Sequence, residues 1–192
     1  MSSVSDSFGV FDMPYLIKNR EHMKKILKPV VWKKLNKVVK RKKYEIIGVW
    51  ENGFRHITNN KRPINTPADL KGIKLRTPNS IWRVKMFKAY GANPSPLSFS
   101  ELFSALKTGT FDGQENPFAQ IHSAKLQEVQ KYLSLTGHVY TPAYVLVSRK
   151  HWKKMPKDIK KILKSAAKET QKATYKKAAE LENSLLADLK KS

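Results

Sequence analysis

Apolar residues recur along this chain in two patterns, one typical of helices and the other typical of strands. Helices are predicted at residues 19–27 and from Pro29 to about residue 42. In the second helix, valines and Leu35 lie on one side and lysines lie on the opposite side. No helix breaker follows Pro156 until nearly the last residue, 192, so a helix of about 30 residues is predicted there. Its apolar stripe is Ile159, Ile162, Leu163, Ala166, Thr170 and Ala173.

Short runs rich in β-branched and aromatic residues predict strands at residues 45–50, 54–58, 73–77, 133–137 and 143–148. Residues 8–17 predict an apolar loop or strand broken by Pro14, and residues 111–121 a turn-rich segment that opens a helix after Pro117. Because strands alternate with helices, we expect an α/β fold with a largely parallel sheet.

Two more helices are predicted between these strands. The first starts after Pro78-Asn79-Ser80, ends at Gly91, and buries Ile81, Val84 and Phe87. The second begins with a capping box formed by Ser98 and Glu101 and ends at Gly109.

Composition narrows the class of protein. The chain has 192 residues, 40% of them hydrophobic, and no apolar run long enough to span a bilayer. It has no cysteine, and its five histidines show no metal-ligand spacing, so we predict neither a metal site nor a cofactor. Residues 1–6 are polar and lack the pattern of a signal peptide.

The net charge of +23 raises the alternative of a nucleic-acid-associated protein that uses the Lys-rich segment 24–43. However, 31 of the 38 basic residues are Lys, whereas paired contacts to phosphates and bases favour Arg. Most of them also fall on the polar faces of predicted helices, where solvated Lys is usual. We therefore expect a solvated surface and no nucleic-acid partner.

Polar residues that could bind an anion follow two of the predicted elements. Arg76 ends the strand IKLRT just before a helix, a position where anions bind and where a guanidinium fork matches a carboxylate, although a surface salt bridge explains it equally well. In Asp112-Gly113-Gln114-Glu115-Asn116-Pro117 the amides of Gln114 and Asn116 can donate to a ligand, and the carboxylates can orient the turn or the arginines.

Two further possibilities stay open from the residues alone. Arg55 is a second cation that could share the same anion, and Trp50, Phe54, Phe99 and Tyr144 could line a pocket or belong to the core. Asp112 and Glu115 could act as an acid–base pair of a hydrolase, but no nucleophile or known catalytic motif accompanies them. We do not expect an enzyme.

Taken together, the motifs KLRTPNS, PSPLSFSEL and DGQENP, with HVYTPAYVLVS, resemble the solute receptors of tripartite ATP-independent periplasmic (TRAP) transporters, the DctP family. The resemblance runs from about residue 8 to residue 185. It implies a type II periplasmic-binding-protein-like α/β fold with two lobes, a cleft between them and a long spanning C-terminal helix. It also implies that Arg76 clamps a ligand carboxylate, that Asn116 contacts the same group, that Phe99 lines the cleft and that Arg55 reaches the ligand.

The resemblance further implies a division of the chain and a cellular role. Residues 1–52 with 142–192 would form a partial first lobe and the spanning helix, and residues 53–141 the second lobe. The protein would bind a small organic acid, of a C4-dicarboxylate type, in the periplasm and deliver it to TRAP membrane subunits. Because relatives start earlier and end later, we expect an interior fragment with an incomplete first lobe, poor stability and weak binding.

Overall fold

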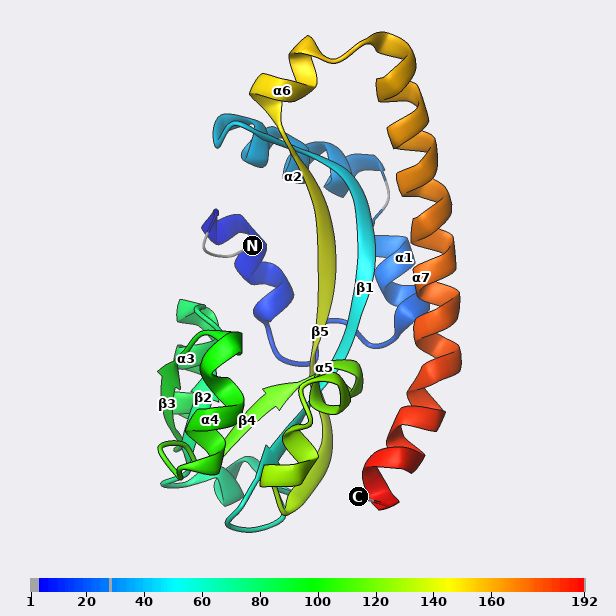
Figure 1. The fold of residues 1–192 in the computed structure, drawn as a ribbon. Coiled ribbons are helices and arrows are strands. Elements are labelled where there is room, and N and C mark those ends of the chain that lie inside the picture. Colours follow the sequence, from blue (N-terminus) through cyan, green and yellow to red (C-terminus); the bar gives the residue numbers. More distant parts are fainter. Residues whose placement is uncertain (1–3, 28, 192) are drawn as a thin grey trace.

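The computed structural model describes residues 4–27 and 29–191, apart from the side chains of residues 29 and 30, and has a mixed α/β fold (Figure 1). Lys28, within the basic segment 24–43, lies outside the described residues. In chain order the elements are η1 (Asp6–Asp12), α1 (Arg20–Ile26), α2 (Pro29–Arg41), β1 (Tyr44–Asn59), η2 (Pro67–Leu70), β2 (Lys74–Thr77), α3 (Ile81–Ala89), β3 (Asn93–Pro96), η3 (Phe99–Glu101), α4 (Leu102–Lys107), β4 (Gly113–Asn116), α5 (Phe118–Ser123), η4 (Leu126–Val129), β5 (Tyr132–Ser148), α6 (Arg149–Lys154) and α7 (Lys157–Lys191).

The sheet has five strands in the order β3-β2-β4-β1-β5. Strands β3, β2 and β4 are parallel, whereas β4 pairs with β1, and β1 with β5, in the antiparallel sense. The expectation of a largely parallel sheet was therefore wrong, because the two longest strands pair antiparallel.

Strands β1 and β5 are each continuous where two short strands had been predicted. They pair from Tyr44 opposite Ser148 to Asn59 opposite Tyr132. The turn residues that suggested interruptions are absorbed by a register shift between Glu51 and Gly53. Pro142, which lacks a donor, is tolerated because β5 is an edge strand. The two paired strands run through most of the length of the molecule (Figure 1).

Several other local predictions were wrong. Residues 6–12 form a 3₁₀ helix rather than a loop or strand, and residues 113–116 form a buried strand rather than a turn. In α3, Ile81 is 57% exposed, and the buried residues are Arg83, Met86 and Phe87. The side chain of Ser98 bonds to the carboxylate of Glu101 but caps no backbone donor.

Three apolar clusters form the core. One lies between η1, α2 and the first part of β1; the second packs α3 against β2; the third joins α4, α5 and the end of α7. Helix α7, 35 residues long, runs along β1 and reaches from Gly48, beside Ala167, to the third cluster through Leu189. It confirms the predicted long helix, but the predicted apolar stripe was wrong. All six of its residues, Ile159, Ile162, Leu163, Ala166, Thr170 and Ala173, are exposed, and the buried residues are Ala167, Tyr175 and Leu189.

Gly113 marks the closest approach of β4 to β1. A Cβ added there would lie 2.4 Å from the carbonyl oxygen of Thr58 and 2.7 Å from the Cβ of Asn59, so the backbones would have to separate. We expect Gly113→Ala to lower the free energy of unfolding by about 1–3 kcal/mol, measured by urea denaturation followed by circular dichroism. Gly48→Ala is the matched control, since its nearest neighbour would be 3.4 Å away. Equal losses in both variants would contradict this explanation.

Candidate functional site

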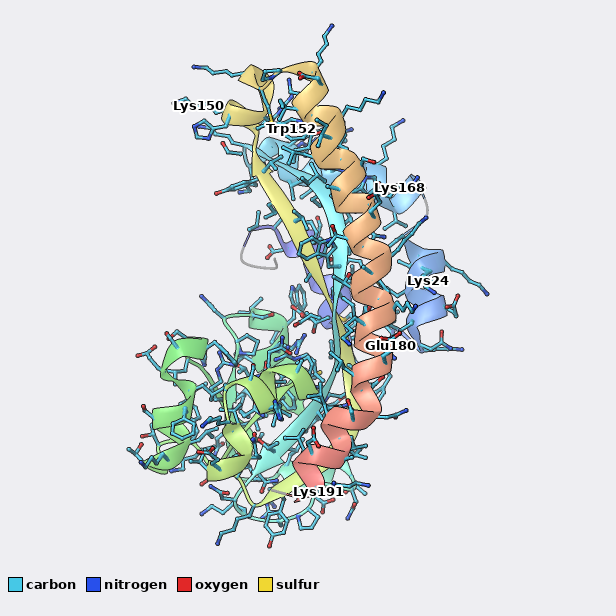
Figure 2. The ribbon with its side chains drawn as sticks, turned by 45° about the vertical axis from the view of Figure 1, so that its right-hand side comes forward. Lys24, Lys150, Trp152, Lys168, Glu180 and Lys191 are labelled. Carbon is cyan, nitrogen blue, oxygen red and sulfur yellow. The ribbon has the colours of Figure 1, made fainter. Side chains whose placement is uncertain are left out.

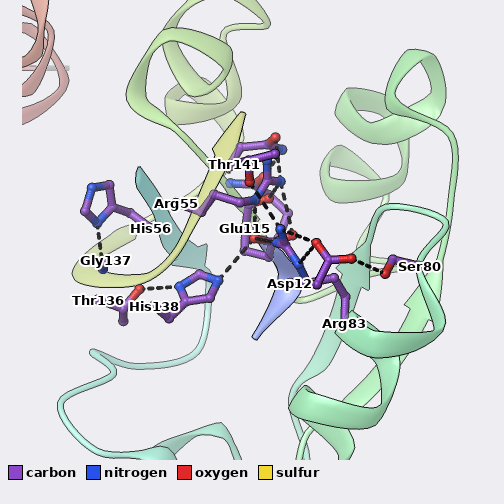
Figure 3. A network of polar contacts seen from close by, with 12 residues as sticks. Asp12, Arg55, His56, Ser80, Arg83, Glu115, Thr136, Gly137, His138 and Thr141 are labelled. Atoms are coloured by element: carbon purple, nitrogen blue, oxygen red, sulfur yellow. Dashed lines mark hydrogen bonds and ion pairs between the residues drawn. The ribbon is translucent and has the colours of Figure 1, made fainter. Parts of the chain in front are cut away.

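The centre of the candidate site is Glu115, whose carboxylate is fully buried on β4. Arg55 on β1 donates from Nε to Oε2 of Glu115 at 2.5 Å and from Nη2 to Oε1 at 3.1 Å. Arg83 on α3 donates from Nη1 to the same Oε2 at 2.9 Å. The ring Nε2 of His138 on β5 lies 3.1 Å from it. Three elements, β1, α3 and β5, are thereby held to one carboxylate on β4 (Figure 3).

Asp12 extends this network to the first part of the chain. Its Oδ1 accepts from Nε of Arg83 at 3.0 Å, and its Oδ2 accepts from the hydroxyl of Ser80 at 2.8 Å. Nη2 of Arg83 also donates to the hydroxyl of Thr141 at 3.1 Å. Arg83 is only 1% exposed, so its three nitrogens are satisfied inside the protein by η1, β4 and β5.

The charges of this network are set by burial and by pairing. Burial alone raises the pKa of Glu115, but the guanidinium groups of Arg55 and Arg83 and the contact with His138 outweigh it and lower the pKa of Glu115 well below its ordinary value. Burial lowers the pKa of His138 and lowers that of His56 to about 4. We therefore infer that Glu115 is ionised and that His56 and His138 are neutral near pH 7.

Arg76 is placed differently from the other two buried arginines. It is 3% exposed, and its Nε and Nη2 both donate to the backbone carbonyl of Leu97, at 2.8 and 2.5 Å. No carboxylate within residues 4–27 and 29–191 forms a salt bridge with it. Burial is the main cause that lowers the pKa of Arg76, to about 10. At neutral pH it remains a buried cation, and its acceptor in the part of the chain that the structure describes is a neutral carbonyl oxygen.

The strand register brings Arg76 beside the polar corner at residues 114–116. Arg76 on β2 is the parallel partner of Gln114 on β4. Asn116 donates from Nδ2 to the side-chain oxygen of Gln114 at 2.6 Å and accepts from Nη2 of Arg55 at 2.9 Å. Gln114 in turn donates to the hydroxyl of Thr58 at 2.9 Å. The two amides thus form a hydrogen-bonded chain from Arg55 to Thr58, which both lie on β1.

The predicted aromatic residues do not form one group. Phe99 is 43% exposed and lies two residues beyond the Leu97 carbonyl that Arg76 binds. Phe54 packs edge-to-face on Tyr140, with ring centroids 5.0 Å apart, and Tyr144 packs in the same way on Phe8 at 5.1 Å. Phe54 and Tyr144 therefore belong to the first core cluster, the alternative that the sequence left open for them.

The geometry does not favour the acid–base pair considered for Asp112 and Glu115. The carboxylate of Asp112 accepts from the backbone N–H of Lys74 at 2.9 Å, while that of Glu115 is enclosed by cations that keep it ionised. A general acid needs a pKa near the working pH, which Glu115 does not have. Both carboxylates instead hold other groups in place, which agrees with the orienting role that the sequence suggested for them.

Sequence reasoning missed Asp12, Arg83 and His138. The signal for Arg83 was its spacing in the predicted helix, because Arg83 lies three and four residues before Met86 and Phe87 and so shares their buried face. Asp12 and His138 gave no local signal, since their contacts join segments far apart in the chain.

Two searches of the described residues bear on other classes of function. Within residues 4–27 and 29–191 no group of three or more His, Cys, Asp or Glu residues is placed to hold a metal ion. In the same part of the chain, no helix combines the length and the hydropathy needed to cross a bilayer.

Comparison with known proteins identifies relatives of this chain. The family model described as bacterial extracellular solute-binding protein, family 7 (DctP), matches residues 1–192. The 2,3-diketo-L-gulonate-binding periplasmic protein of Escherichia coli is 36% identical over 191 residues, which cover 100% of this chain and 58% of that protein. The chain thus spans little more than half of this relative.

Solved structures agree with the sequence match. A TRAP periplasmic solute-binding protein from Polaromonas, bound to D-erythronate, superimposes with a TM-score of 0.94 at 38% identity, covering 99% of this chain and 63% of the other. A TRAP solute-binding protein from Sulfurospirillum deleyianum with bound succinate gives a TM-score of 0.93 at 37% identity, covering 99% and 61%. These values confirm the predicted fold class.

We expect the Glu115 network to contribute strongly to the free energy of unfolding. In Glu115→Gln the guanidinium groups of Arg55 and Arg83 lose their shared carboxylate while staying buried, so we expect the free energy of unfolding to fall by about 3–5 kcal/mol. Urea denaturation measures the loss. The control Glu180→Gln, at an exposed glutamate of α7, should change stability by less than about 0.5 kcal/mol. Adding Arg55→Met to Glu115→Gln should recover part of the loss, because Arg55 pairs with no other carboxylate among the described residues; no recovery would contradict the charge explanation.

The buried His56 makes stability depend on pH. Its folded pKa of about 4 lies below the unfolded value of 6.5, so between these values the unfolded chain binds a proton that the folded chain does not. Stability from this group is complete above about pH 6.5 and is lost as the pH falls toward 4. His56→Gln keeps an acceptor for the N–H of Gly137, and we expect it to reduce the slope of stability against pH by up to about 1.4 kcal/mol per pH unit. Denaturation at a series of pH values measures both slopes, and identical slopes would refute the assignment.

Proposed function

Because this chain belongs to the bacterial extracellular solute-binding proteins of family 7, the solute receptors of TRAP transporters and not a family of enzymes, we propose that it binds a small organic acid through the guanidinium of Arg76. The observation that carries the proposal is the state of this side chain. It is a buried cation whose acceptor, among the described residues, is a neutral carbonyl oxygen, so a carboxylate would supply the charge that it lacks.

The charges around the site support an anionic ligand. Glu115 is paired with Arg55 and Arg83, and Asp12 is paired with Arg83. Burial lowers the pKa of Arg76, and repulsion from Arg55 adds to this effect. Three buried guanidinium groups therefore share two carboxylates, and one positive charge is left over. An incoming carboxylate would balance this excess in a site of low dielectric constant.

Individual contacts follow from the same geometry. Asn116 and Gln114 would hold their amides beside the ligand, while Phe99, which is partly exposed, would form an apolar wall. For Arg55 we propose an indirect role, since Glu115 and Asn116 already occupy its Nε and Nη2. It would position Asn116 and add positive potential rather than clamp the ligand.

For the ligand we propose the class of small hydroxy acids, sugar acids and dicarboxylates. The named relatives bind 2,3-diketo-L-gulonate, D-erythronate and succinate, which share a carboxylate and differ in the rest of the molecule. A C4-dicarboxylate is one member of this class. The common carboxylate is the group that Arg76 would hold, so Arg76 would set the class while other residues would set the size.

We propose that the chain has two lobes, with residues 1–52 and 142–192 in the first and residues 53–141 in the second. A register shift between Glu51 and Gly53, opposite Pro142 and Thr141, supports this boundary because pairing is weakest at such shifts. Gly53 also has a φ of 113°, a conformation that other residues rarely adopt. Closure of the two lobes would bend both strands at this register shift. It would take place in the periplasm, before the solute is delivered to TRAP membrane subunits.

The test uses NMR, which detects weak as well as tight binding. ¹⁵N-labelled chain is titrated with succinate, D-erythronate and D-galactonate, and we expect at least one of them to shift the signals of the Asn116 amide and the Arg76 Nε–H. Arg76→Ala should weaken binding by about 2–5 kcal/mol, because a buried charged partner is lost. Arg76→Lys should also bind more weakly, since an ammonium cannot form the two parallel bonds.

The matched control is Arg62→Ala. Arg62 also donates only to backbone carbonyls, those of Asp69 and Lys71, but it is exposed and should leave binding unchanged. Unaltered affinity in Arg76→Ala would remove Arg76 from the site. Absence of shifts with all three acids at saturating concentration would reject binding by this chain on its own.

A further inference from the structure

One end of the molecule carries a concentration of positive charge that the proposed site does not use. We call this surface the basic end and define it as residues 33–43, in α2 and the turn after it, and residues 149–164, in α6 and the start of α7. These two segments contain fifteen Lys or Arg residues and a single acidic residue, Asp158. They come together at the end of the molecule opposite α3 and α4 (Figure 1).

The two segments meet in one cationic hollow. The backbone N–H of Arg149 donates to the carbonyl of Lys43 at 2.9 Å, which joins the turn after α2 to the start of α6. Beside this contact is a hollow of about 220 Å³ whose lining side chains all carry positive charge: Lys40, Lys43, Arg149, Lys150 and Lys153. No salt bridge to any of the five occurs in the described part of the chain.

The charge along α7 is also uneven, and the excess of lysine lies at the end of the helix that belongs to the basic end. Residues 157–168 contain five lysines and one acidic residue, whereas residues 169–191 contain five lysines and four acidic residues. Lys150 marks the basic end in Figure 2, and Glu180 and Lys191 mark the part of α7 with mixed charge. The excess of lysine is therefore a property of one end and not of the whole helix.

Apolar side chains are exposed among these lysines. Ile159 is 39%, Ile162 61% and Leu163 36% exposed on the first turns of α7, and Tyr44, next to Lys43, is 42% exposed. Trp152 is buried beneath the same surface, with the ammonium of Lys164 at 5.8 Å from its ring. A basic face beside an exposed apolar face is the arrangement of helices that lie at the surface of a bilayer.

From this arrangement we propose that the basic end docks on the surface of a membrane rich in anionic phospholipid. Thirteen of its fifteen cations are lysines, which act as mobile point charges and suit a diffuse layer of lipid phosphates. Exposed isoleucine and leucine side chains can enter the headgroup layer, whereas a nucleic-acid backbone offers them no partner. Membrane docking goes beyond solute binding and does not depend on it.

The experiment is co-sedimentation of the whole chain with vesicles, without any organic acid present. Vesicles of phosphatidylcholine are compared with vesicles that also contain phosphatidylglycerol. We expect binding to the anionic vesicles only, and its loss at about 1 M salt, where charges are screened beyond about 3 Å. Absence of binding to the anionic vesicles, or equal binding to both kinds, would overturn the proposal.

A pair of matched variants tests the location. The quadruple variant Lys40→Gln, Lys43→Gln, Lys150→Gln and Lys153→Gln removes four charges from the hollow. Each lysine near an anionic surface contributes about fivefold in affinity, so we expect a loss of the order of several hundredfold. The control removes four exposed charges elsewhere, by Lys71→Gln, Lys88→Gln, Lys107→Gln and Lys131→Gln, and should bind nearly as the original does. Equal losses would mean that net charge alone attracts the chain and would reject the basic end.

Two further arms separate this proposal from others. Tighter binding to duplex DNA than to anionic vesicles at the same salt concentration would assign the basic end to nucleic acid instead. Arg76→Ala should bind vesicles as the original chain does, because Arg76 is buried away from this surface. Failure of solute binding and failure of membrane docking can therefore be told apart.

Discussion

The structure depends on the burial of one carboxylate, that of Glu115, between two guanidinium groups. A lone charge moved from water into the protein interior would be strongly destabilising, and it is tolerated here because Arg55, Arg83 and His138 all contact it. The same contacts tie β4 to β1, α3 and β5. These partners occupy the carboxylate of Glu115, which acts on Arg76 of the neighbouring strand through space but forms no salt bridge with it in the described part of the chain. Arg76 is therefore a buried cation without a contacting carboxylate among residues 4–27 and 29–191.

The long antiparallel pair β1 and β5 decides where these side chains can meet. Arg55 and His138 lie on its two strands, close to the register shifts that separate the first core cluster from the other two. Helix α7 follows the pair over its length and joins the first cluster to the third. Arg20 adds a second connection, because its guanidinium bonds to Glu51 on β1 and to Glu182 on α7. The network at Glu115 therefore holds both strands of the pair, and the contacts of Arg20 hold β1 to α1 and α7.

Local sequence patterns predicted most elements but not how they pair. The helices at 20–26, 29–41 and 157–191 were recognisable because apolar spacing and breakers are local properties. The continuity of β1 through Asn52-Gly53 was not, because a register shift is a relation between two strands. For the candidate site, the sequence predicted Arg76, Arg55 and the corner at residues 114–116 from strand ends and from the resemblance. It also suggested that Glu115 orients the arginines, which its contacts with Arg55 and Arg83 show. Arg83 and His138 were missed because their partners are distant in sequence.

Net charge by itself would misdirect any interpretation of this protein, because its positive charges act in two separate ways. Arg76 is buried, so its field is little screened and acts on whatever lies within a few ångströms. The lysines of the basic end are exposed, and at physiological salt their influence falls off within about 8 Å. Helix α7, which starts at that end, is about 50 Å long at 1.5 Å per residue and ends at the third core cluster. The exposed lysines of the basic end and the buried Arg76 are therefore separate sources of positive charge, and only Arg76 belongs to the proposed solute site. Where a charge lies, and what already neutralises it, determines its role more than how many there are.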